Sequence, residues 1–446
     1  MKSTISKVLH PVLYRPMLHH LLDVASKLPH ASLNVVVGEN REQVAEACAE
    51  YKALNYVDQP SPRGTGHAVL CAREALQKKG GTVLVLNGDV ILMRPETLSA
   101  FVESHAAKGA VGSLVSAQFK DPRGYGRILR DGAGRPLAIR EEKDCSETER
   151  QVSEINVGVY LFDTDALFES LERVQTGNKQ KEYYLTDVIE ILISRAESVN
   201  AFMIADPTEA LGINDRLALA EAERILSGRL RAYWMREGVS LQVPETITID
   251  SRSRLSRDVQ IEGNCRVVNS SIESGVYIEA GCRIENSTIR AGVHLKEGCY
   301  LEDSDVGPNS TLGPYLHLRP GTRLEAGVKL GNFVEVKNSH IGKDSKASHL
   351  SYIGDAEVGA DVNIGCGFVT CNYDGTNKHR TVIEDGVFVG SDSQTVAPLT
   401  IGKGAYVASG TTLTRDVPPG ALAIARLKQT NKEGFVARLK SRKKKD

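Results

Sequence analysis

The chain has 446 residues, with 55 Lys and Arg against 56 Asp and Glu, and a formal net charge of −1. Its length predicts two domains of ordinary size, and its near-neutral balance argues against a nucleic-acid partner. No apolar run approaches the roughly 18 residues of a membrane span, and the start lacks the layout of a secretory signal. We therefore expect a cytoplasmic protein, with the basic run KSRKKKD at its end as a solvated tail.

The first half of the chain alternates short apolar runs with helical segments. The runs LNVVVG, TVLVLNGDV, AVGSLVSA and VGVYLF read as strands, and the alternation is typical of a doubly wound α/β domain, which we place at residues 1–213. Asp89 ends one of these runs, at the edge where open α/β sheets bind ligands, although an Asp there is often only a turn or a helix cap. A charged linker helix is expected at 214–239, followed by a second domain at 240–446.

The second half carries a sequence repeat. Cys265, Cys282 and Cys299 are spaced 17 residues apart, and aliphatic residues recur in steps of six or five from about residue 255. The first series is Ile272, Ile278, Ile284, Ile289, Leu295, Leu301, Val306, Leu312, Leu318, Leu324, Leu330, Val336 and Ile341, and the second is Ile383, Val389, Thr395, Ile401, Val407 and Leu413. Three steps make one coil of 17 or 18 residues.

A sustained step of six fits neither a helix nor a lone alternating strand. It predicts a parallel β-helix, in which three short strands per coil each place one aliphatic residue inward and successive coils stack. The three cysteines then form one internal ladder, and we interpret them as core residues rather than as metal ligands.

Candidate chemistry lies where the repeat is interrupted. GCGFVTCNYDGTNKHRTV at 365–382 is too long for one step, and SKASHLSYIGD before it holds His349. Most histidines on a surface have no catalytic role. Here, however, an imidazole could act as the base that removes a proton from an attacking amine, and nearby Arg319, Lys337 and Lys378 could hold a phosphate.

The repeat resembles the left-handed β-helix of hexapeptide-repeat acyltransferases. LRPG, GNFVEVKNS, SKASHLSYIGD, VNIGCG, TCNYDGTNK, VGSDSQ and ALAIARLKQTNKEGF resemble the acetyltransferase half of the bacterial bifunctional glucosamine-1-phosphate acetyltransferase and N-acetylglucosamine-1-phosphate uridyltransferase family. In the first half, NGD, QPSPRGTGHA, GYGRI, REEKD, EINVGVY, EYYLTD and GIND resemble that family's nucleotidyltransferase domain.

The resemblance implies roles for residues of the second half. His349 would be the catalytic base, and the residues that bind the sugar phosphate would be Arg319, Lys337, Tyr352, Asn363 and Lys378. Acetyl-CoA would lie along Cys366, Asn372, Tyr373, Ser391, Ser409 and Arg426. The family residue at 366 and 409 is most often alanine, but Cys366 and Ser409 are still small. The family's acetyl sites form between the subunits of a trimer, so a homotrimer is expected.

Roles in the first half follow in the same way. Asp89 and Asn214 would hold Mg²⁺, and Lys7 would contact phosphate. Gln59, Gly64 and Thr65 would read uracil, while the sugar would be bound by Gly126, Glu141 and Asn156. Without the resemblance, the glycines would be read as ordinary turns. The implied product, UDP-N-acetylglucosamine, is the precursor of bacterial cell-wall peptidoglycan and outer-membrane saccharides.

The family's domain begins with a strand and a loop of the form L-A-A-G-x-G-T-R-M, directly before a stretch like KSTISKVLHPV. Met1 corresponds to the end of that loop, so we expect the first strand and the nucleotide-binding turn to lie outside this sequence. Three hypotheses stay open at this point. They are a bifunctional enzyme with an internal recorded start, a short form that only acetylates, and a non-catalytic trimeric scaffold or sugar-nucleotide sensor.

Overall fold

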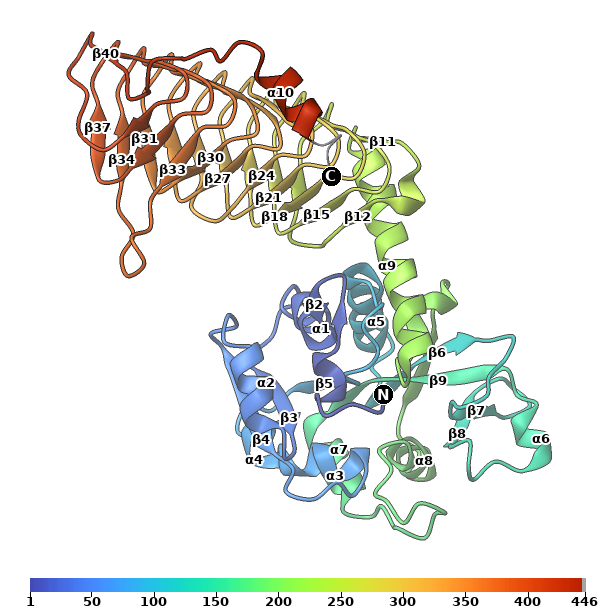
Figure 1. Cartoon of the computed structure of the whole chain (residues 1–446). Helices are drawn as coiled ribbons and strands as arrows, with labels where there is room; N and C mark the ends of the chain where they lie inside the picture. Colours follow the sequence, from blue (N-terminus) through green and yellow to red (C-terminus); the bar gives the residue numbers. More distant parts are fainter. Residues whose placement is uncertain (443–446) are drawn as a thin grey trace. The chain divides into compact units, whose positions relative to one another are not determined.

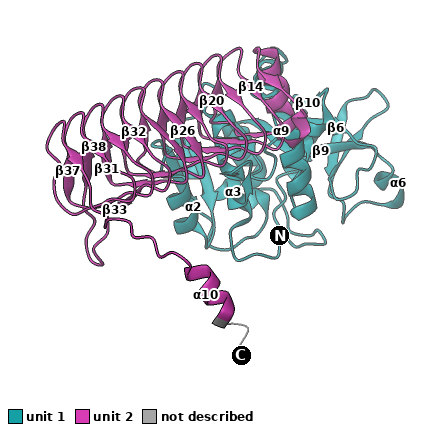
Figure 2. Cartoon of the chain, turned by 45° about the horizontal axis from the view of Figure 1, so that its top comes forward, with its two compact units in different colours: residues 1–226 teal, residues 227–446 magenta. Residues whose placement is uncertain are grey.

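The structure, a computed structural model, describes residues 1–442. The chain divides into two compact units, Met1–Leu226 and Ser227–Asp446, coloured separately in Figure 2. The division falls inside helix α9 (Arg216–Arg236), which is the expected charged helix. Helix α10 (Phe435–Arg442) ends with the first three residues of the KSRKKKD run, and the remaining four lie outside the described residues.

A mixed sheet forms the centre of the first unit (Figure 1). Its order is β10 (Val199–Met203), β6 (Gly112–Gln118), β9 (Glu154–Asp163), β7 (Arg127–Arg130) and β8 (Pro136–Arg140), and β5 (Thr82–Leu86) also pairs with β9. Strand β9 runs antiparallel to β5, β6 and β7. Its alternate side chains enter two separate hydrophobic clusters, with Tyr160 in one and Val159 in the other. Both faces of the sheet are therefore covered.

Helices supply the rest of these clusters. Leu98 and Phe101 of α5 pack in one, and Leu167 of α7 and Val188 of α8 pack in the other. The helices of the unit before α9 are α1 (Met17–Ala25), α2 (Arg41–Ala47), α3 (Thr65–Cys71), α4 (Arg73–Gln77), α5 (Pro95–Ala107), α6 (Glu147–Arg150), α7 (Thr164–Leu171) and α8 (Asp187–Ser194).

Strands β3 (Leu33–Val37) and β5 of the first unit each pair on one side only within the described residues. β3 pairs in parallel with β4 (Leu54–Asp58) in a separate sheet, and β5 pairs with β9. Neither β3 nor β5 has a second neighbour within residues 1–442. Most of their aliphatic side chains are only partly buried, whereas those of β6 and β9 are almost all fully buried. These two edges therefore lack the cover that the middle of the sheet has.

The second unit is a parallel β-helix, as predicted from the step of six. Its described strands form three sheets of 11, 10 and 9 strands, in which each strand pairs with a strand one coil away (Figure 1). Every member of the two aliphatic series is buried, the least so being Leu413 at 6% exposure. Cys265, Cys282 and Cys299 are buried in the same core. One inward residue per short strand is thus the repeating unit of the core.

The three sheets of the β-helix and the corners between them are used below to locate the sites. The first sheet contains β26 (Lys329–Asn332), β29 (Lys346–His349), β32 (Asn363–Ile364) and β35 (Phe388–Val389), and the second contains β24 (His317–Leu318), β27 (Glu335–Lys337), β30 (Tyr352–Gly354) and β33 (Val369–Cys371). The third contains β28 (His340–Ile341) and β31 (Ala356–Val358). Turns from the first sheet to the second form the first corner, and those from the second to the third form the second corner.

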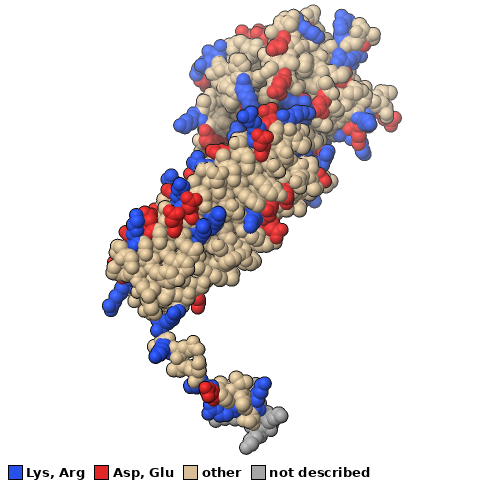
Figure 3. Space-filling view, turned by 90° about the horizontal axis from the view of Figure 1, so that it is seen from above, with Lys and Arg blue, Asp and Glu red and all other residues tan. Residues whose placement is uncertain are grey.

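Charged side chains on the face in Figure 3 stand in small groups of both signs, with wide neutral areas between them. Elsewhere in the described ion pairs, Arg290 likewise lies between two acidic side chains, Glu273 and Asp305. That face therefore presents no extended basic surface, in keeping with the balanced composition. No helix within residues 1–442 is long and apolar enough to cross a membrane.

Candidate functional site

His349 begins a column of small residues along the first corner. β26 pairs with β29 so that Asn332 lies beside His349. The pairing of β29 with β32, extended by two residues past the last pair, places Cys366 next to His349. Extending the pairings of the following strands in the same way places Ser391 next to Cys366 and Ser409 next to Ser391. Four predicted site residues, separated by up to 60 positions in the sequence, therefore form one line on successive coils.

Glycines beside this column let the coils approach closely. A Cβ on Gly331 would lie 1.8 Å from the carbonyl oxygen of Ser348, and one on Gly365 would lie 2.6 Å from the backbone nitrogen of Ser391. At the far end, the Arg426 guanidinium donates to the carbonyl oxygen of Ser409 at 2.6 Å. The result is a strip of small side chains with an imidazole at one end and a cation at the other.

Asn332 fixes the orientation of the imidazole. The Oδ1 atom of Asn332 lies 2.8 Å from Nδ1 of the exposed His349. An amide oxygen only accepts hydrogen bonds, so Nδ1 carries the proton in this pair and Nε2 keeps a free lone pair. The ring is thereby held in the tautomer of a general base.

Three cations gather at the second corner. Arg319 follows β24 and lies beside Lys337, and Lys378 approaches from the loop after β33. The pKa of Lys337 is lowered, first by Lys378 and then also by Arg319, because like charges disfavour each other. Arg319 pairs with Glu335 at 2.8 Å, whereas neither Lys337 nor Lys378 has an acidic partner within ion-pair distance in the described chain. An anion would relieve this repulsion.

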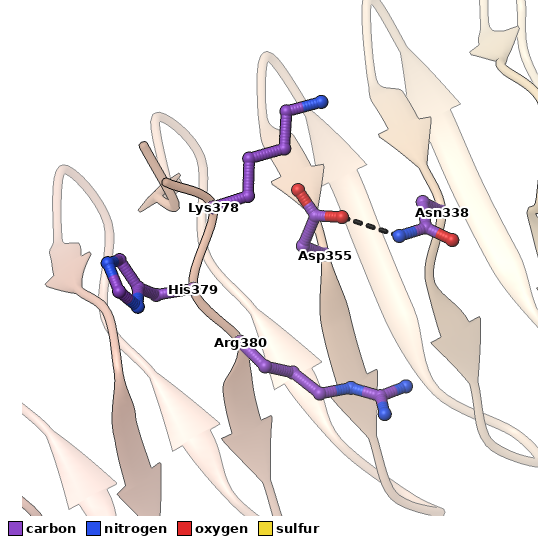
Figure 4. A pocket seen from close by; sticks show the side chains of 5 residues that line it. All are labelled: Asn338, Asp355, Lys378, His379 and Arg380. Atoms are coloured by element: carbon purple, nitrogen blue, oxygen red, sulfur yellow. Dashed lines mark hydrogen bonds between the residues drawn. The ribbon is translucent and has the colours of Figure 1, made fainter. Parts of the chain in front are cut away.

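The loop that carries Lys378 closes over a small pocket. Figure 4 shows Lys378 and Arg380 extending on either side of Asp355, while His379 points away from it. Asp355 accepts hydrogen bonds from the side-chain amides of Asn338 and Asn372. Asp374 accepts from the backbone N–H groups of Thr376 and Asn377 and pairs with His379. The loop is therefore held in shape by its own side chains.

The other predicted residues of the second unit are divided between these regions. Asn372 and Tyr373 belong to the second-corner loop and not to the small-residue column. Tyr352 begins β30, and its ring covers Gly354, where a Cβ would lie 2.4 Å from the phenol oxygen. Asn363 is in register with Lys346 and Phe388 on the first sheet, on the other side of the coil from the cations. One chain therefore does not bring all of the predicted acetyl-site residues together.

In the first unit, Lys7 joins the two predicted metal ligands. Its Nζ atom lies 2.6 Å from Asp89 Oδ2 and 2.6 Å from Asn214 Oδ1. The N–H of Ile213 donates to the carbonyl oxygen of Asp89 at 3.0 Å, which brings the two segments together. Both side-chain oxygens point at one positive charge, so the donor set suits a hard cation that takes few protein ligands and completes its shell with phosphates and water. No cluster of three or more His, Cys, Asp or Glu side chains in residues 1–442 could hold a metal.

The residues predicted to read uracil also lie together. Gln59 donates to the carbonyl oxygen of Gly64 at 3.2 Å, and the Thr65 hydroxyl accepts from the N–H of Leu185 at 3.2 Å. Gly64 has φ +103°, and a Cβ there would lie 2.6 Å from the carbonyl oxygen of Tyr183. Glycine is required here both by its backbone conformation and by this close approach.

The three residues predicted to bind the sugar form a second group. Asn156 donates from its backbone to Gly126 at 2.8 Å, and Glu141 follows Arg140, which pairs with Arg127. Burial raises the pKa of Glu141, even though its carboxylate accepts from the Thr186 hydroxyl. Asn156 donates to the Tyr160 hydroxyl at 2.7 Å. Gly126 lies close to Asn156, since a Cβ on Gly126 would be 3.5 Å from the Cβ of Asn156.

Sequence reasoning missed the residues that position others. Asn332 lies in GNFVEVKNS, 17 residues before His349, and that spacing is the one signal that could have linked them. Asp355 stands 17 residues before Asn372 in the same way. The role of Glu335 depends on the rotamer of Arg319, for which the sequence holds no signal.

Known proteins match this chain over 98–100% of its length. Residues 2–235 match the nucleotidyl transferase family. The chain is 44% identical over 436 residues to the bifunctional protein GlmU of Shouchella clausii, with 98% of this chain and 96% of that protein covered. It is 46% identical over 444 residues to the bifunctional protein GlmU of Geobacillus thermodenitrificans, with 100% and 96% covered.

The cation cluster at the second corner predicts a measurable electrostatic effect. Replacing Lys378 with Gln removes the largest cause of the lowered Lys337 pKa, so that pKa should rise towards the value of an ordinary lysine. NMR titration of the lysine side chains can measure it. Lys403→Gln, on a later coil where Lys403 faces Asp385, is the control and should not move it. An unchanged Lys337 pKa in Lys378→Gln would show that the two ammonium groups do not interact.

Proposed function

The chain belongs to the family of the bifunctional GlmU proteins, and from this we propose that it is an enzyme with two transferase activities. The second unit transfers the acetyl group of acetyl-CoA to glucosamine 1-phosphate. The first unit transfers the uridylyl group of UTP to N-acetylglucosamine 1-phosphate, giving UDP-N-acetylglucosamine and pyrophosphate. The observation that carries the first activity is the column that runs from His349 to Ser409.

His349 acts as the general base of acetyl transfer. The amine of glucosamine 1-phosphate attacks the thioester carbon, and Nε2 of His349 takes the proton that the nitrogen gives up. The C–S bond then breaks, and CoA leaves as the thiol after its sulfur receives that proton. Asn332 keeps the hydrogen on Nδ1, so the ring cannot present a donor to the amine. The positive charge that develops on the ring is stabilised by the same amide oxygen.

The cations of the second corner hold the sugar phosphate. Lys337 and Lys378 repel each other, and a phosphate between them converts this repulsion into two charge-assisted hydrogen bonds. Arg319 adds a planar donor set, and its partner Glu335 keeps that side chain in place. Tyr352 on the second sheet and Asn363 on the first sheet are also proposed to contact the sugar, and because they lie on different sides of the coil we propose that they do so from different subunits.

Acetyl-CoA lies along the column of the first corner. Cys366, Ser391 and Ser409 are small, so they leave room for the extended thioester arm beside the coil. Arg426 at the end of the column supplies a cation for the phosphates of the co-substrate. Asn372 and Tyr373 are proposed to complete this site from another subunit, since they belong to the second-corner loop.

A homotrimer accounts for this division of residues. Tyr315, Phe333 and Leu350 project from the first corner on successive coils and are between 50% and 57% exposed. Each has a positive φ, between 42° and 57°, which bulky residues rarely adopt. Apolar side chains held outward in strained turns beside His349 are suited to burial against a second copy, whose second-corner loop would then reach the column.

Uridylyl transfer uses the groups of the first unit. Gln59, Gly64 and Thr65 hold uracil, Gly126, Glu141 and Asn156 hold the sugar, and Lys7 contacts phosphate. Asp89 and Asn214 hold Mg²⁺, which neutralises phosphate charge when bound. The substrates acetyl-CoA and UTP support a cytoplasmic location.

Replacing His349 with Ala should lower kcat for acetyl transfer by about 10²–10⁴-fold, the usual contribution of a positioned base. The rate is measured by thiol release from acetyl-CoA. The control is His294→Ala, because His294 is paired with Glu279 and lies on the first sheet three strands before the strand of His349. Wild-type kcat in His349→Ala, with chemistry rate-limiting, would exclude His349 as the base.

Replacing Phe333 with Asp should dissociate the trimer, since three carboxylates would be buried in the proposed interface. Light scattering gives the molar mass, and acetyl transfer should fall with the loss of trimer. Val243→Asp is the control, because Val243 is 54% exposed and also has a positive φ but lies several coils before Tyr315, Phe333 and Leu350. A Phe333→Asp protein that stays trimeric would place the interface elsewhere.

A further inference from the structure

Lys7 occupies the position that a metal ion would take in the first unit. Its ammonium nitrogen is 2.6 Å from one oxygen of Asp89 and 2.6 Å from the amide oxygen of Asn214. Lys7 is the one cation within ion-pair distance of Asp89 in the part of the chain that the structure describes. The proposed metal ligands are therefore already neutralised from within the protein.

An ammonium and a divalent cation cannot share this place. Both would need the same two oxygen atoms, and charges of the same sign a few ångströms apart repel strongly where solvent is partly excluded. The side chains of Lys7 and Asp89 are 37% and 23% exposed, so screening by water is incomplete. A metal ion must break both bonds of Lys7 before it can bind.

We propose that Lys7 is an internal counter-ion of the metal site, which a divalent cation displaces towards the nucleotide phosphates. The inference rests on the proposed role of Asp89 and Asn214 as metal ligands. Once displaced, the ammonium has lost an anionic partner, and a triphosphate provides another. Metal binding and phosphate binding are then positively coupled, because the metal ion displaces the Lys7 ammonium and the phosphates accept it.

The test measures Mn²⁺ binding to the full chain without nucleotide, by electron paramagnetic resonance of the free ion. Lys7→Met keeps the length of the side chain and removes its charge, so Mn²⁺ should bind at least about tenfold more tightly. Lys52→Met, which removes an exposed lysine of the same unit, is the control for net charge. In 0.5 M KCl a long-range effect of charge is screened, whereas the effect of direct competition should persist.

A second measurement needs no variant at position 7. In the wild-type protein, Mn²⁺ should increase the rate at which an amine-acylating reagent modifies Lys7, read by mass spectrometry, because displacement frees the ammonium. Unchanged Mn²⁺ affinity in Lys7→Met, or Lys7 modification that Mn²⁺ does not accelerate, would overturn the inference. Asp89→Asn separates the two proposals: if it leaves Mn²⁺ binding intact, the metal site itself is wrong, and if it abolishes binding, only the role of Lys7 is in question.

Discussion

The stacking of coils is the constraint on which the second unit depends. Each short strand buries one side chain, and its backbone bonds to the coils on either side, so residues at the same step of the repeat must lie in line. The same geometry produces the buried line of Cys265, Cys282 and Cys299 and the line of His349, Cys366, Ser391 and Ser409 at the surface, in which Cys366 is partly buried. The stacking of the coils is therefore sufficient to align surface residues in straight columns. An extended substrate can lie along such a column.

The repeat also explains why the cations of the second corner stay close together although they repel one another. Arg319 and Lys337 are neighbours because their coils are neighbours, and neither backbone can move apart without breaking strand pairs. Lys378 is different, since it reaches the cluster from a loop fastened by Asp374 and His379. A fixed pair of cations with a third on a loop is compatible with the phosphate site that we propose at this corner.

Much of this could be predicted from the sequence, because the step of six is local and strict. Leu301 and Ile401 are buried as expected, and the cysteines lie in the core. The column along the first corner was hidden in the sequence, because the loop before Arg380 lengthens one coil and places Ser391 25 residues after Cys366. Only the strand registers reveal that these residues are adjacent. The roles of individual side chains came from resemblance, since no periodicity assigns a base or a uracil contact.

The first unit shows the opposite relation between sequence and site. Its strands were visible as apolar runs, but the bond between Lys7 and Asn214 joins residues 207 positions apart, and no local pattern encodes such a contact. The unpaired edges of β3 and β5 likewise depend on sheet order and not on composition. In a repeat, the position of a functional group follows from its place in the period. In a mixed sheet it follows from topology, so no local pattern could group the polar residues of this half. The proposed metal, uracil and sugar groups came from the resemblance, and the structure adds contacts such as those of Lys7 with Asp89 and Asn214.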